Sequence, residues 1–141
     1  MGMEIKLAIV GSRTFDDYET FRKVVDEFLR DNNFKLIRII SGGCRGADTL
    51  ANRLSQENDV DLITFMPEWG KYGKRAGLIR NQEIIKSCDV CMAFWDGVSN
   101  GTSNAIASCK KFHKPCWVFD FINGCFTQIP EFFLHPTLER Q

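Results

Sequence analysis

The chain has 141 residues, of which 44% are hydrophobic and 26% charged, so it is not intrinsically disordered and is expected to form one compact domain. Eighteen basic residues balance eighteen acidic residues, and this zero net charge argues against nucleic acid as a partner, because proteins that bind it usually cluster positive charge. No apolar run is long enough to cross a membrane and no signal peptide is evident, so we expect a cytoplasmic protein without a membrane partner.

The first half of the chain alternates between apolar runs and amphipathic segments. Residues 6–10 predict a buried strand, and residues 16–29 predict a helix that begins at an acidic N-cap. Residues 36–40 predict a second strand, which a helix from Ala47 follows, and residues 61–66 predict a third strand. The strand runs are continuously apolar, which is typical of strands buried on both faces.

The second half continues the alternation. It predicts a helix over residues 74–87, a strand over 90–95, a helix over 102–112 and a strand over 115–121. Alternating strands and helices indicate βαβ units. We therefore expect residues 1–121 to form a single Rossmann-like α/β domain, with a five-stranded parallel sheet of order 3-2-1-4-5 and helices on both faces.

The last segment, residues 122–141, loses this alternation. It contains Phe126, Phe132 and Phe133, which predict a C-terminal tail that packs on an edge of the domain or on a partner. Composition does not decide between these two positions, and it leaves the oligomeric state open, a homodimer included.

Six cysteines are too scattered for a disulfide framework. Cys88 and Cys91 have the spacing of metal ligands, but no second pair accompanies them, and neither His113 nor His135 has ligand spacing to them. We therefore predict reduced core thiols, no structural disulfide, no zinc or other metal site and no required cofactor.

Three glycine-rich loops follow the first, second and fourth predicted strands, and each opens a helix. Glycine lets backbone N–H groups approach a ligand closely, and a helix N-terminus favours an anion. Because parallel strands present their carboxyl ends at one edge, the loops predict a phosphate-binding cleft. The candidate ligand-binding residues in the loops are Gly11, Ser12, Arg13, Thr14, Gly42, Gly43, Arg45, Gly46, Ala47, Asp48, Asp96, Ser99, Gly101 and Thr102.

The helix over residues 74–87 and the segment before it add four candidates. Arg80 and Asn81 flank the inward stripe of this helix, so Arg80 either runs past apolar surface into water or reaches a bound phosphate. Trp69 offers a flat ring on which a base could stack, or it is a core or rim tryptophan, and Lys71 follows it. The P-loop motif and the dinucleotide motif G-x-G-x-x-G are both absent, and no Ser-His or Cys-His nucleophile is evident.

Five segments in order resemble the YspA/cpYpsA-related branch of the SLOG superfamily, the Rossmann-like group that includes the DprA and Lonely Guy proteins. The segments are residues 11–15, 41–48, 69–74, 80–82 and 94–102. The resemblance covers about residues 5–121. It implies a cleft for a nucleotide-derived ligand of the ADP-ribose or NAD class, and a phage or bacterial protein that acts as a ligand sensor in antiviral signalling.

One departure from the related Lonely Guy enzymes argues against an enzyme. Arg80 and the turn at Gly101 match their pattern, but Asn104 stands where those enzymes carry a glutamate. Cleavage of an N-glycosidic bond needs a carboxylate, and an asparagine cannot supply one. Asp48 and Asp96 are the remaining candidate carboxylates, although each could instead cap a helix or form a turn.

The leading functional hypothesis is therefore a sensor or sequestering protein that binds a nucleotide-derived small molecule. The alternative is a nucleotide N-glycosidase or phosphoribohydrolase that uses Asp48 or Asp96. A single-stranded DNA-binding protein is a third hypothesis, which the neutral charge and a lack of interleaved basic and aromatic residues disfavour.

Overall fold

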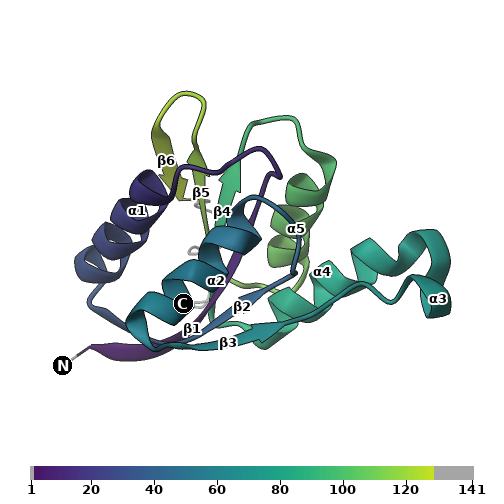
Figure 1. The fold of residues 1–141 in the computed structure, drawn as a ribbon, viewed down its shortest axis with the longest axis horizontal. Coiled ribbons are helices and arrows are strands. Elements are labelled where there is room, and N and C mark those ends of the chain that lie inside the picture. The colour runs from purple at the N-terminus through teal and green to yellow at the C-terminus, as the bar shows by residue number, and fades with distance from the viewer. Residues whose placement is uncertain (1, 129–141) are drawn as a thin grey trace, which may run out of the picture.

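The structure, a computed structural model, describes residues 2–128 and contains a six-stranded sheet with helices on both of its faces (Figure 1). The elements are β1 (Met3–Gly11), α1 (Tyr18–Asp31), β2 (Phe34–Ser41), α2 (Ala47–Asn58), β3 (Asp61–Thr64), α3 (Trp69–Tyr72), the 3₁₀ turn η1 (Gly73–Arg75), α4 (Ala76–Ser87), β4 (Val90–Trp95), α5 (Asn100–Lys111), β5 (Cys116–Asp120) and β6 (Cys125–Gln128). The order is β3-β2-β1-β4-β5-β6, and the first five strands are parallel.

The five parallel strands confirm the predicted order, but the prediction of five strands is wrong. β6 pairs antiparallel with β5, after a turn over residues 121–124. A parallel neighbour would need a long crossover, whereas a short turn only permits the chain to fold back on itself. Phe126 on this strand packs against the rings of Phe28 and Phe119, with centroid distances of 6.3 and 6.2 Å. Phe132 and Phe133 lie outside the described residues.

Helices α1 and α2 cover one face of the sheet with large apolar side chains. Asp17 caps α1, as predicted, by accepting the N–H of Thr20 at 3.1 Å. Beneath these helices Phe94 lies within ring contact of Phe15 and Phe21. This face is the aromatic half of the core.

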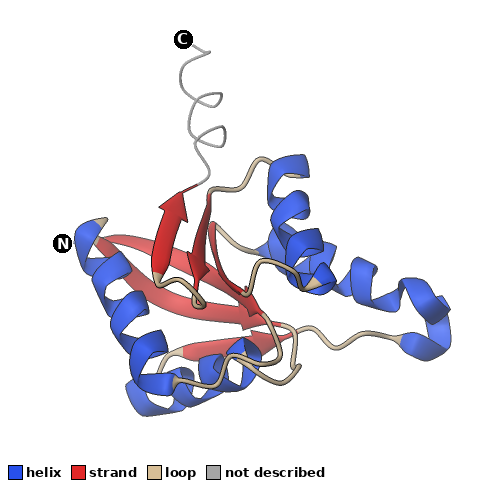
Figure 2. Cartoon of the chain, turned by 90° about the horizontal axis from the view of Figure 1, so that it is seen from above, coloured by secondary structure: helices blue, strands red, loops and turns tan. Residues whose placement is uncertain are grey.

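Helices α4 and α5 cover the other face, where the buried side chains are small. They are mostly alanine, cysteine and β-branched residues, namely Ala8, Val10, Ile40, Ile84, Ile85, Cys88, Cys91, Ala93, Ala105, Cys109, Cys116 and Val118. Seen from above, the sheet lies between the helices of its two faces (Figure 2). Among the helices of residues 2–128, none has the length and apolar composition to cross a lipid bilayer.

The segment before α4 projects away from the rest of the molecule (Figure 2). We call residues 66–75 the arm. Trp69 on α3 is 58% exposed and Met66 is 61% exposed. The sequence predicted one helix over residues 74–87; α4 begins at Ala76, after the short helix α3 and the turn η1. The glycines at positions 70 and 73 have no atoms near where a Cβ would stand, so nothing of the body packs against them.

Candidate functional site

A cleft opens at the carboxyl ends of β1 and β4, where the strand order reverses. Its volume is about 350 Å³, within the range of small-ligand sites. It is lined by Val10, Gly11, Ser12, Arg13, Thr14, Gly42, Cys44, Asp48, Arg80, Asn81, Ile84, Ser99, Asn100, Gly101, Thr102 and Ala105. The three glycine-rich loops and α4 therefore meet at one place, as their order along the chain predicted.

Close backbone approach holds the loops together. Gly46 has φ of 80°, and a Cβ on it would collide with the Ser12 carbonyl oxygen, so this position requires glycine. The Ser12 N–H donates to the Phe94 carbonyl at 2.9 Å, and the Ser12 hydroxyl accepts the Asp96 N–H at 3.2 Å. Ser12 thus links the loop after β1 to the loop after β4.

Arg80 crosses from α4 to the loop after β2. Its Nη1 donates to the Gly42 carbonyl at 2.6 Å, and its Nε donates to the Asn81 Oδ1 at 2.9 Å. A Cβ on Gly42 would lie 2.7 Å from that Nη1, so the arginine fits only against a glycine. Within residues 2–128 its Nη2 group has no hydrogen-bond partner. Arg80 is therefore a structural link between α4 and the loop after β2 as well as a cation at the cleft, and its contact with a bound phosphate stays a prediction.

Asn81 joins α4 to the start of α5. Its Nδ2 donates to the Asn104 Oδ1 at 3.1 Å and to the Gly101 carbonyl at 3.3 Å. Asn104, the position that the resemblance compared with a glutamate of the Lonely Guy enzymes, thus helps to hold the start of α5 against α4.

Two helices begin at the cleft without a side-chain cap. Within residues 2–128, neither the N-cap of α2, Gly46, nor that of α5, Ser99, places a side chain on the first backbone N–H groups of its helix. Uncapped N–H groups at a helix start are donors for an anion, and the helix dipole adds to the attraction. Both helix starts and the Arg80 guanidinium favour a phosphate group.

Asp48 is a buried carboxylate in the cleft. It is 8% exposed and accepts the Cys44 N–H at 2.8 Å. Burial raises its pKa to about 6, while the Cys44 N–H and the charge of Arg80 act in the opposite direction. Asp48 therefore changes charge not far below neutral pH.

Asp96 has a different role. Its Oδ1 accepts the N–H groups of Val98 and Ser99 at 2.9 and 2.8 Å, and its Oδ2 accepts the Ser99 hydroxyl at 2.8 Å. These bonds, that of the Val98 N–H foremost, lower the pKa of Asp96 to about 2. Its oxygens shape the turn before α5, which matches the turn-forming alternative.

Most of the predicted site residues line the cleft, and some do not. Those that do not are Gly43, Arg45, Gly46, Ala47, Trp69, Lys71 and Asp96. Arg45 is exposed beside the cleft, and Ala47 is fully buried under it. The lining residues that sequence reasoning missed are Val10, Cys44, Ile84, Asn100 and Ala105. Cys44 and Asn100 lie inside the glycine-rich loops, so their position was a usable signal, whereas the apolar lining side chains carried none.

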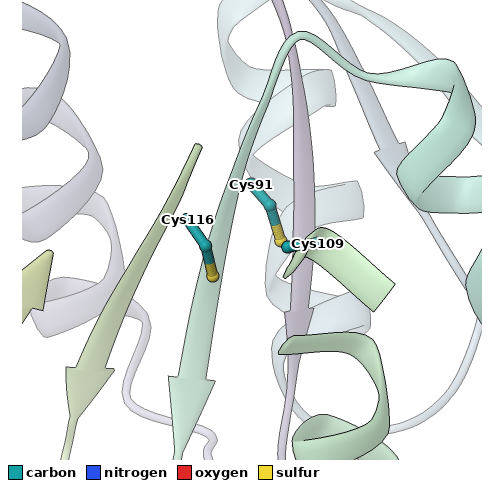
Figure 3. A group of neighbouring side chains, drawn as sticks. All are labelled: Cys91, Cys109 and Cys116. Carbon is teal, nitrogen blue, oxygen red and sulfur yellow. The ribbon is translucent and has the colours of Figure 1, made fainter. Parts of the chain in front are cut away.

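The cysteines that meet in the structure are not the pair whose spacing resembles that of metal ligands. All six are free, and Cys88 does not join Cys91 in a cluster. Cys91 on β4, Cys109 on α5 and Cys116 on β5 do meet, fully buried, with their sulfur atoms within 4.8 Å of one another (Figure 3). The thiols of Cys109 and Cys91 donate to the Cys116 sulfur and lower its pKa.

Three comparisons place the chain among known proteins. The family model "YspA, cpYpsA-related SLOG family" matches residues 5–72. The Gene 61 protein of Mycobacterium phage D29 is 32% identical over 116 residues, which cover 78% of this chain and 92% of that protein. The chain therefore belongs to the YspA, cpYpsA-related SLOG family.

Among solved structures, the fold resembles DNA processing protein A from Helicobacter pylori, with a TM-score of 0.58 and 23% identity. The match covers 81% of this chain and 64% of that protein, so this chain spans less than two thirds of its length. That structure concerns the mode in which the H. pylori protein binds single-stranded DNA.

This likeness corrects two predictions. A small-molecule ligand of the ADP-ribose or NAD class was predicted, and nucleic acid was predicted to be an improbable partner. Both predictions are wrong: the solved neighbour with this fold binds single-stranded DNA, and the relative is a phage protein. The physical error was to use net charge, which does not say how charges are distributed over the surface.

Proposed function

We propose that this protein binds single-stranded DNA, with a backbone phosphate in the cleft and bases along the arm. The observation that carries the proposal is that a cleft suited to phosphate continues into an exposed basic and aromatic segment. Nonspecific binding of single strands combines these two features, a positive groove for the backbone and rings for the bases.

The arm and the start of α4 are locally basic although the whole chain is neutral. Between Glu68 and Glu83 the sequence has four basic residues, Lys71, Lys74, Arg75 and Arg80, and no acidic residue. Trp69 and Tyr72 alternate with them along the chain. Basic and aromatic residues are therefore interleaved in this segment. The sequence analysis, which stated that such interleaving is lacking, was wrong on this point.

Arg80 connects the two features. It lines the cleft, and it also lines a second groove of about 320 Å³ between the arm and α4. The lining of that groove also includes Met66, Tyr72 and the carboxylates of Glu68 and Glu83. A strand whose phosphate contacts the Nη2 group of Arg80 would have its next bases beside the arm, where Trp69 presents most of its ring to solvent.

The proposal is tested with a fluorescently labelled oligothymidylate and anisotropy titrations at several salt concentrations. Trp69→Ala removes the stacking ring, and we expect the affinity to fall by about 1–3 kcal/mol, or roughly 5- to 150-fold. Arg75→Ala removes an exposed arm cation, so affinity should fall and the slope of log K against log salt should shrink by about 0.7 for each phosphate that the variant no longer neutralises. Arg30→Ala on α1, on the other side of the molecule (Figure 1), is the matched control.

Equal affinity for the wild type and Trp69→Ala, or an equal loss in Arg30→Ala, would remove the arm from the interface. Absence of binding by the wild type at low salt would reject the proposal as a whole. A single-stranded RNA of the same length tests whether the sugar matters, and a duplex tests whether unpaired bases are required.

A further inference from the structure

Three thiols from distant parts of the chain meet in the core under α5. Cys91 and Cys116 are register partners on neighbouring strands, and Cys109 reaches them from the helix above (Figure 3). Each has a relative exposure of 0%. Their sulfur atoms lie within 4.8 Å of one another, and a metal–sulfur bond of about 2.3 Å would bring three sulfurs to about 4.0 Å apart. The distances between the three sulfur atoms therefore need to shorten by less than about 1 Å for the sulfurs to hold an ion.

The ligand set selects the kind of ion. Thiolates are soft ligands that favour Cu(I) and zinc, and zinc in structural sites takes four ligands. The cluster contains three cysteines and, among residues 2–128, no histidine or carboxylate completes it. Cu(I) forms stable complexes with two or three thiolates, and a fully buried site denies it water as a further ligand.

The surroundings offset part of the charge. On binding, each coordinating thiol loses its proton to solvent as a Cu–S bond forms, and no electron is transferred. Three thiolates and one Cu(I) leave two negative charges, which is costly in an apolar core without a counter-ion. Lys114 brings one positive charge to the edge of this cluster, because its Nζ donates to the Cys88 carbonyl at 2.6 Å.

We propose that Cys91, Cys109 and Cys116 form a buried site for a single Cu(I) ion. The ion would join α5 to β4 and β5. Because α5 begins at the cleft, occupancy would also stiffen the loop over residues 99–102. The proposal does not depend on DNA binding, since its measurements concern the metal alone.

The test uses the full chain without a histidine tag, in a Cys44→Ser/Cys125→Ser background that removes the two thiols with exposed surface. The protein is incubated with Cu(I) without oxygen, desalted against a chromophoric Cu(I) chelator and assayed for copper. We expect one copper per chain. Cys109→Ala should lower the affinity at least as much as loss of a partner around a metal does, about 10–100-fold.

Cys88→Ala is the matched control, because Cys88 is a buried thiol of the same core cluster that lies outside the triad. It should keep the copper, and Cu(I) should raise the melting temperature of the control but not that of Cys109→Ala. If Cys109→Ala does not fold, X-ray absorption of copper in the background protein decides, since the proposal requires a shell of sulfur alone. No retained copper, equal retention by both variants, or nitrogen or oxygen in the shell would overturn the proposal.

Discussion

The two faces of the sheet are built from different kinds of side chain. Along β4, Val90, Met92 and Phe94 point to the face under α1 and α2, while Cys91 and Ala93 point to the face under α4 and α5. All five are buried, so hydropathy does not distinguish the faces, but side-chain volume does. The aromatic face is filled by rings, and the other face by small side chains.

This difference has a consequence for the cleft. Small side chains let helices lie close to a sheet, because packing distance follows side-chain size. α4 places Arg80 against the Gly42 carbonyl, and α5 places its uncapped first turn at the same edge. The small-residue face therefore supplies two of the three helices that meet at the cleft, and α2 from the aromatic face supplies the third.

The largest expected effect comes from removing a ring at the centre of the aromatic face. Phe94 is fully buried and packs on Phe15, Phe21 and Phe119. We expect Phe94→Ala to lower the free energy of unfolding by about 3–5 kcal/mol. Urea denaturation followed by circular dichroism measures this; a decrease below about 1 kcal/mol would show that the rings are not the main support of the fold.

An increase in the free energy of unfolding is expected when the Asp48 carboxylate is removed from α2, the helix of the aromatic face that begins at the cleft. Burial raises the pKa of Asp48 from 3.8 to about 6, so between these values the folded state holds a proton that the unfolded state has lost. Stability therefore falls as pH rises through this window, and the deficit persists above it. Asp48→Asn should be more stable than the wild type by about 2–3 kcal/mol near pH 8 and equal to it near pH 4.

Thermal unfolding of both proteins across this pH range checks the sign. Wild-type DNA binding should also tighten as pH falls through about 6, because protonation removes a negative charge from the cleft, and Asp48→Asn should lose that dependence. A pH-independent difference between the two proteins would contradict the assignment.

On the small-residue face the sensitive change is an added side chain. Ala93 is fully buried next to Phe94 in sequence but faces α4 and α5. We expect Ala93→Leu to cost about 1–3 kcal/mol by overpacking and to displace these helices from the sheet. Oligothymidylate affinity of the folded variant should therefore fall, whereas folded Phe94→Ala should keep its affinity. Retained affinity in Ala93→Leu together with lost affinity in Phe94→Ala would contradict the proposed difference between the two faces.

The smallest effect is expected at the margin of the aromatic face. Phe126 on β6 is 42% exposed, and its remaining surface contacts Phe28 and Phe119. Phe126→Ala should lower stability by about 1 kcal/mol, the value of an aromatic pair beyond simple burial. A shift in the urea midpoint without a change in slope is the expected observation.

Much of the fold could be predicted because local pattern and topology agree. The five predicted strand runs are mostly apolar, each of the first four is separated from the next by a helical segment, and right-handed crossovers leave few strand orders. The glycine-rich loops then had to meet at one edge. β6 was not predicted, because residues 125–128 are only four and show no clear alternation, although Asn123-Gly124 directly before them is a hairpin-turn dipeptide that the sequence analysis did not use.

The features of the site that the sequence could not predict are those that depend on the three-dimensional arrangement of segments and not on their order along the chain. Exposure of Trp69 is a property of the projecting arm, and the sequence could not separate it from a core tryptophan. The sequence predicted Cys88 and Cys91 to be reduced core thiols in spite of their metal-like spacing, and both are free and buried. Cys91, Cys109 and Cys116 meet only through three elements whose register the sequence does not specify.

The central place of β1 has a consequence for synthesis of the chain. β1 pairs with both β2 and β4, and the Lys6 N–H donates to the Asp89 carboxylate across 83 positions of sequence. Such distant pairings form late, because closing a long loop costs entropy before any contact repays it. On the ribosome, β1 therefore has an unpaired edge until β4 has emerged, and β4 has one until β5 has emerged, while the cleft assembles only after α5 has emerged. A nascent chain truncated before residue 100 should lack the cleft and be prone to aggregate.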